Sequence, residues 1–182
     1  MIEKLKFSLI LLFMSSTVLA QTEWRQELQK NLPLFGHRNW VLVVDAAYPY
    51  QSKAAIQTIV TNEDHLDVVK EVLETIKKAP QINPEIFLDK EIDFVQDEEA
   101  KGMERFRRQL YKILDDNFVN KTVHEDLIVE VDKAAEVFHI LVLKTNMTLP
   151  YTSVFIRLDC GYWNADQETK MRDRMKKSNK DE

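Results

Sequence analysis

The residues best suited to acid–base chemistry in this sequence lie at the two ends of one apolar run. Trp40–Val44 consists of apolar β-forming residues; Gly36 and His37 come before it, and Asp45 follows it directly. Histidine and aspartate are side chains that transfer protons near neutral pH. A carboxylate that accepts a hydrogen bond from one histidine ring nitrogen fixes the tautomer of the ring. The pattern therefore suggests general acid–base catalysis by His37, with Asp45 as its partner.

The run Trp40–Val44 is expected to form a central strand. An unbroken apolar run is typical of a strand that is buried on both faces of a covered sheet. Asp45 then falls at the carboxyl end of this strand, and Tyr48-Pro49 turns the chain away. Open α/β sheets bind ligands at the carboxyl ends of their strands, so a binding site is expected beside Asp45.

Helices and strands alternate along the rest of the chain. Apolar residues at helical spacing predict helices over 22–34, 61–78 (with its N-cap), 98–114 and 123–136. Runs rich in β-branched and aromatic residues predict strands over 54–60, 83–95, 138–143 and 151–158. This alternation predicts an α/β fold, a single domain with a central sheet flanked by helices.

Composition excludes several classes of function. The net charge of −5 leaves no basic surface for nucleic acid, and three glycines are too few for a phosphate-binding loop. The residues that could bind a metal show no paired ligand spacing: His37, His65, His124, His139 and Cys160. A serine hydrolase would need a nucleophile elbow, which the sequence lacks. We therefore expect neither a metal nor a nucleotide cofactor bound by a glycine-rich loop.

The two ends of the chain differ from its middle. Residues 1–20 have a basic start, an apolar stretch and small residues before Gln21, which is the pattern of a signal peptide cleaved near Ala20-Gln21. We therefore expect a secreted or periplasmic protein without a membrane anchor after cleavage, with its domain over 21–163. Residues 164–182 are polar and rich in both charges, and are expected to form a solvated helix or tail.

A first motif suggests a family. Gly36-His37 is followed after seven residues by Asp45-Ala46, and Pro49 lies four residues beyond the aspartate. This spacing resembles the strand motif of the D-ribose pyranase / L-fucose mutarotase family (RbsD/FucU).

A second motif resembles the closing motif of the same family. Lys144-Thr145 is followed by Pro150-Tyr151 and by an apolar strand that ends near Gly161. Two shorter segments, Thr61-Asn62-Glu63 and His124-Glu125, resemble other parts of the family pattern more weakly. All four segments come in the order of the family and span most of the chain after residue 20.

The resemblance implies a fold and an activity. Members of the family have an α/β fold and form ring-like homo-oligomers with sites at subunit contacts. They exchange the anomers, or the pyranose and furanose forms, of free monosaccharides without a cofactor. By resemblance, His37 is the catalytic histidine, Asp45 its carboxylate partner, His124 a second site histidine and Tyr151 the sugar-binding tyrosine. Lys144 and Ser153 occupy further substrate-binding positions.

Several positions leave alternatives open. Asn146-Met147 stands where the family usually has Gly-Glu, Lys144 replaces an arginine, and Ser153 replaces an asparagine that often binds the sugar. A non-catalytic monosaccharide-binding module on the same fold is therefore the alternative function, followed by a scaffold without a small ligand. The residues also have structural interpretations: His37 as a turn residue, Asp45 and His124 as helix-start residues, and Tyr151 as core packing.

Overall fold

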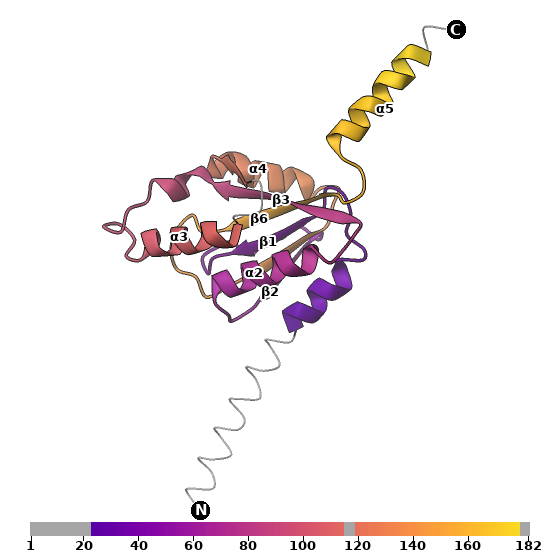
Figure 1. Ribbon diagram of the computed structural model, residues 1–182. Coiled ribbons are helices and arrows are strands. Elements are labelled where there is room, and N and C mark those ends of the chain that lie inside the picture. Colours follow the sequence, from indigo (N-terminus) through magenta and orange to yellow (C-terminus); the bar gives the residue numbers. More distant parts are fainter. Residues whose placement is uncertain (1–22, 115–118, 179–182) are drawn as a thin grey trace, which may run out of the picture.

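The computed structural model describes residues 23–114 and 119–178, which form one α/β domain around a six-stranded sheet. The strands lie in the order β2-β5-β1-β6-β3-β4. Figure 1 labels four of them, β2, β1, β6 and β3. Their bounds are Trp40–Val44 (β1), Ile56–Val60 (β2), Ile82–Asp89 (β3), Val119–Thr122 (β4), Ile140–Lys144 (β5) and Val154–Cys160 (β6). The predicted signal peptide lies outside the described residues. None of the helices in the described ranges has the length and apolar character needed to cross a membrane.

The strand β1 is the centre of the fold, as the apolar run predicts. It is the third of six strands, and all five of its residues are buried. It pairs in parallel with β5 and antiparallel with β6, and β6 in turn pairs antiparallel with β3. Since β2 and β4 run parallel to β5 and β3, five strands end at one edge of the sheet, where β6 begins.

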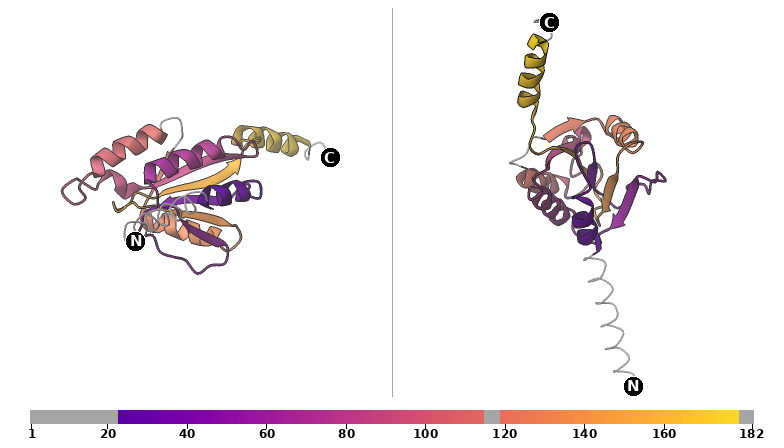
Figure 2. Two further views of the ribbon diagram at one scale, coloured as in Figure 1. Left: turned by 90° about the horizontal axis from the view of Figure 1, so that it is seen from below. Right: turned by 90° about the vertical axis from the view of Figure 1, so that its right-hand side faces the viewer.

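Helices cover both faces of the sheet. The helices are α2 (His65–Ile76), α3 (Met103–Leu114), α4 (His124–Ala134) and α5 (Ala165–Ser178), preceded by an N-terminal helix over residues 23–31. The N-terminal helix, α2 and α3 pack on one face through residues such as Trp24, Val68 and Phe106. The helix α4 packs on the other face through Leu127 and Val131. Figure 2 shows the sheet between these two groups.

Two predicted elements differ from the observed ones. The predicted strand over 83–95 ends at Asp89, and Lys90–Asp93 forms a 3-10 helix instead. The strand β4 was not predicted, because Val119 is the only apolar residue in it. A short polar segment carries no strand periodicity of its own, so pairing with β3 decides its conformation.

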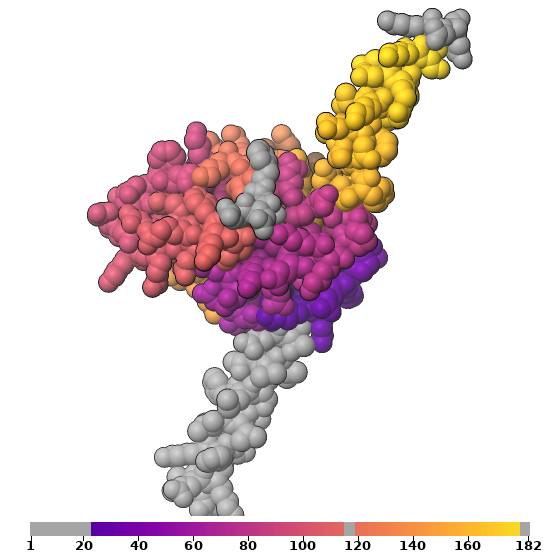
Figure 3. Space-filling view, in the orientation of Figure 1, coloured from indigo at the N-terminus to yellow at the C-terminus, as the bar shows by residue number. Residues whose placement is uncertain are grey.

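The polar C-terminal segment forms α5, which has no buried residue. In Figure 3 this helix stands clear of the body of the domain. Its residues therefore add nothing to the core.

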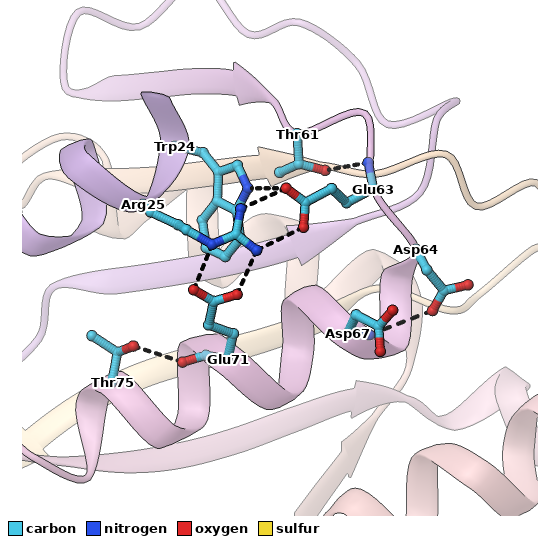
Figure 4. Close-up of polar contacts among 8 residues, drawn as sticks. All are labelled: Trp24, Arg25, Thr61, Glu63, Asp64, Asp67, Glu71 and Thr75. Carbon is cyan, nitrogen blue, oxygen red and sulfur yellow. Dashed lines mark hydrogen bonds and ion pairs between the residues drawn. The ribbon is translucent and has the colours of Figure 1, made fainter. Parts of the chain in front are cut away.

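An ion-pair cluster holds the N-terminal helix against α2 (Figure 4). The Arg25 guanidinium donates hydrogen bonds of 2.6 Å and 2.9 Å to Glu63, and two of 2.6 Å to Glu71. Trp24 Nε1 donates to Glu63 as well, at 2.9 Å. Such bidentate pairs are the stronger class of charged hydrogen bond. The cluster positions Glu63, whose backbone carbonyl accepts the N–H of Asn146 in the β5–β6 loop.

One glycine is required by close backbone packing at the end of β6. A Cβ atom on Gly161 would lie 2.4 Å from the Pro80 carbonyl oxygen and 2.7 Å from the Ile82 nitrogen. Because both atoms belong to the backbone, we expect Gly161→Ala to lower the free energy of unfolding by about 1–3 kcal/mol. Urea unfolding measures the change. Gly36→Ala is the matched control, since no atom lies within 4 Å of its added Cβ; equal losses in the two variants would contradict the prediction.

Candidate functional site

The register of the sheet brings polar side chains from distant segments to its carboxyl edge. Val154 at the start of β6 lies opposite both Val43 in β1 and Leu88 in β3. Ser153 therefore lies between the ends of β1 and β3, close to Asp45 and Asp89. This is the edge at which open α/β sheets bind ligands, as the position of Asp45 predicts.

Asp45 and Ser153 form a hydrogen-bonded pair. The Ser153 hydroxyl donates to Asp45 Oδ2 at 3.2 Å, and the Ala47 N–H donates to Oδ1 at 2.8 Å. Asp45 is half-buried, and Ser153 is buried. Beside the pair lies an open hollow of about 380 Å³ that is lined by residues 45–47 and 147–150. The carboxylate is thus held in a fixed position next to a space that a small ligand can enter.

His124 and Asp89 form a second pair at this edge. His124 Nδ1 lies 3.1 Å from Asp89 Oδ1, and Asp89 is 1% exposed. Burial raises the pKa of the Asp89 carboxyl to about 6, although its hydrogen bond with His124 acts in the opposite direction. The His124 side chain is 37% exposed, so the pair links a buried carboxylate to the surface.

Tyr151 lies against the ring of His124. The two ring centroids are 5.6 Å apart in an edge-to-face arrangement, and Tyr151 is 38% exposed. The backbone of Tyr151 has a φ of 55°, in the left-handed region that a tyrosine seldom occupies. Tyr151 is therefore not a core residue, and its partly exposed ring could stack on a ligand next to His124.

Lys144 lies at the end of β5 and is half-buried. Its ammonium group donates a 2.6 Å hydrogen bond to the backbone carbonyl of Tyr48. In this arrangement Lys144 holds the loop that follows Asp45. Its predicted contact with a substrate stays a prediction.

Beneath the site lies His65, which the sequence analysis did not assign to it. Its Nδ1 shares a 2.9 Å hydrogen bond with the Thr145 hydroxyl, and its Nε2 has no hydrogen-bond partner among the described residues. The ring is 1% exposed, and burial lowers the pKa of His65 to about 4. His65 is therefore a neutral residue that supports the β5–β6 loop.

Asp89 was also missed, although a signal for it existed. It follows the apolar residues Ile86–Leu88 at the end of β3, just as Asp45 follows β1. His65 had no such signal, because it begins an amphipathic helix and only the packing shows that its ring is buried. Within the described ranges, no group of three or more His, Cys, Asp or Glu residues is arranged to hold a metal ion.

The prediction that His37 and Asp45 of one chain form a hydrogen bond is wrong. The two residues flank β1 at opposite ends, and a five-residue strand spans roughly 13 Å. His37 Nδ1 instead lies 3.2 Å from Asp159 Oδ1 on β6, and both side chains are about half exposed. The pair borders an open groove of about 510 Å³ that also involves Arg38, Lys133 and Arg157.

Comparisons with known proteins agree with this fold. The model of the RbsD / FucU transport protein family matches residues 23–160. The structure of Bacillus subtilis RbsD complexed with D-ribose is similar, with a TM-score of 0.52 and 17% identity over 73% of this chain and 91% of that chain. The Streptococcus pneumoniae fucose mutarotase in complex with L-fucose has a TM-score of 0.46 and 12% identity, with the same coverage of 73% and 91%. No curated protein matches the sequence. The family match covers well over half of the chain, which therefore belongs to the RbsD / FucU transport protein family.

Proposed function

We propose that this protein binds a free monosaccharide and exchanges its anomers or its pyranose and furanose forms. The observation that carries the proposal is the convergence of Asp45, Ser153, His124 and Tyr151 at the carboxyl edge of the sheet. These are the groups that the family resemblance places around a sugar. Family members were solved with D-ribose and with L-fucose, which supports a monosaccharide as the ligand.

Opening a sugar ring requires two proton transfers. A base takes the proton of the anomeric hydroxyl, while the bond between the anomeric carbon and the ring oxygen breaks. The electron pair of that bond goes to the ring oxygen, which takes a proton from an acid and leaves an open-chain carbonyl. Rotation and closure by the reverse steps give the other anomer or ring size. General acid–base catalysis contributes about 10²–10⁴-fold, and no metal or nucleophile is needed.

The position of His37 favours a site shared between copies of the chain. His37 lies at the opposite end of β1 from Asp45 and is 55% exposed, so it is free to reach another molecule. We propose that His37 of one copy completes the Asp45 site of a neighbouring copy in a homo-oligomer. Large apolar side chains support a protein contact near the site: Val123, beside His124, and Phe94 are 41% and 69% exposed.

The alternative function is monosaccharide binding without turnover. Two residues that were predicted to bind the substrate already form hydrogen bonds within the chain, which favours this alternative. Lys144 donates to the Tyr48 carbonyl, and Ser153 donates to Asp45. Such a site could bind a sugar through fewer free groups and leave its ring closed.

Exchange NMR on ribose and fucose at equilibrium tests the proposal, with the wild-type protein and the His37→Ala variant. We expect faster exchange between ring forms or anomers with the wild type and loss of this acceleration in the variant. Binding without faster exchange would contradict catalysis and support the alternative. Absence of both effects would contradict both functions for these sugars.

A mixing experiment tests the shared site. His37→Ala and Asp45→Asn variants are each expected to be inactive alone, yet a co-refolded mixture should regain part of the exchange rate. Recovery requires that His37 and Asp45 from different copies meet in one site. A mixture that stays inactive, with oligomers present on gel filtration, would contradict the shared site.

A further inference from the structure

We infer that Asp89 is a positioning residue for proton transfer, because its buried carboxylate holds the His124 ring in one tautomer and stabilises its imidazolium form. The inference rests on the proposed function and adds a residue to it that the family resemblance does not place in the site. His124 would then be the base that takes the proton of the anomeric hydroxyl.

The geometry of the pair supports this role. Asp89 Oδ1 lies 3.1 Å from His124 Nδ1, and His124 is the hydrogen-bond partner of this carboxylate among the described residues. With Asp89 ionised, Nδ1–H donates to the carboxylate, so Nε2 carries the lone pair that can accept a proton. A buried carboxylate is costly unless it is paired, and His124 supplies a hydrogen-bond partner for Asp89.

A different carboxylate holds the backbone of His124. Both oxygens of Glu91 lie 3.2 Å from the His124 N–H at the start of α4. Glu91 therefore caps the helix, while Asp89 contacts the ring. This division separates a structural role from a role in proton transfer and makes Glu91 the matched control.

The charges around Asp89 set the expected pH dependence. Burial is the largest influence on the pKa of Asp89, and it raises this pKa to about 6. The charges of Glu91 and Asp45, at the ends of neighbouring segments, also raise it, whereas His124 on α4 lowers it. Tyr48 also faces these carboxylates and stays protonated, since burial raises its pKa. As the pH falls through about 6, Asp89 takes up a proton and no longer stabilises the imidazolium. We therefore expect the exchange rate to fall on the acid side of this value.

The test compares Asp89→Asn with Glu91→Gln in the full chain. The tautomer of the His124 ring is read from its ¹⁵N-¹H NMR shifts, and exchange rates on ribose and fucose are measured from pH 5 to 8. We expect Asp89→Asn to release the His124 ring from the Nδ1–H tautomer, to reduce the exchange rate about 10²-fold and to leave sugar affinity within about threefold. Glu91→Gln should leave the tautomer and the maximal rate unchanged. Because it removes a charge that raises the pKa of Asp89, it should move the fall in rate to lower pH without abolishing it.

Three outcomes would overturn the inference. In the first, the His124 tautomer is the same in Asp89→Asn as in the wild type. In the second, the exchange rate of Asp89→Asn still falls at low pH as it does in the wild type. In the third, both variants lose stability and rate in parallel, as a helix cap alone would require. If the wild type exchanges neither sugar, the proposed function fails for these sugars, and the NMR shifts of the ring nitrogens still decide whether Asp89 holds the His124 tautomer.

Discussion

Asp45→Asn is expected to reduce the rate of sugar ring exchange by about 10²–10³-fold, the range of a lost acid–base or charged contact in an active site. The amide keeps the size of the side chain and can still accept a hydrogen bond from Ser153 or Ala47. It removes the negative charge that would accept strong hydrogen bonds from sugar hydroxyls and stabilise a protonated histidine. Exchange NMR with excess ribose or fucose measures the rate.

The matched control is Asp126→Asn, which makes the same change at an exposed position in the first turn of α4. We expect it to leave the exchange rate unchanged. Ser153→Ala is the intermediate case, because it removes one hydrogen bond to Asp45 but keeps the carboxylate. A rate for Asp45→Asn equal to that of Asp126→Asn would show that Asp45 has no part in the chemistry.

The second large effect concerns stability, and His65 is its source. Burial lowers the pKa of His65 from 6.5 to about 4 in the folded protein. Between these two values the unfolded chain binds a proton at this residue and the folded chain does not. The neutral His65 therefore contributes to the free energy of unfolding at pH 6.5 and above, and this contribution is lost as the pH falls from about 6.5 to about 4. A shift of this size corresponds to roughly 3 kcal/mol.

Comparison with His65→Gln isolates this contribution. Glutamine can still hydrogen-bond the Thr145 hydroxyl but cannot titrate. Asp89 acts in the opposite direction, because its raised pKa makes stability fall as the pH rises from about 4 to about 6. Urea unfolding of both proteins from pH 4 to 7.5 should give a difference that grows with pH up to about 6.5. If the free energies of unfolding of the two proteins changed in parallel with pH, the assignment of a neutral, buried His65 would be contradicted.

Local patterns in the sequence determined much of this structure. The apolar run Trp40–Val44 predicted the buried central strand, and the strand position of Asp45 predicted a site at the carboxyl edge. The family motifs singled out His124 and Tyr151, which lie together in the folded chain. These features depend on periodicity and on residue spacing within one segment, and both can be read directly from the sequence.

Only the tertiary structure decided which residues from different segments meet. Asp159 rather than Asp45 pairs with His37, because β6 runs antiparallel beside β1 and ends where β1 begins. Asp89 meets His124 through the pairing of β3 with β4, a strand whose polar residues gave no periodic signal. The burial that shifts the pKa values of Asp89 and His65 is likewise a property of packing between layers. Spacing along a strand sets distances within it, but the order and direction of strands in the sheet set which side chains share a site.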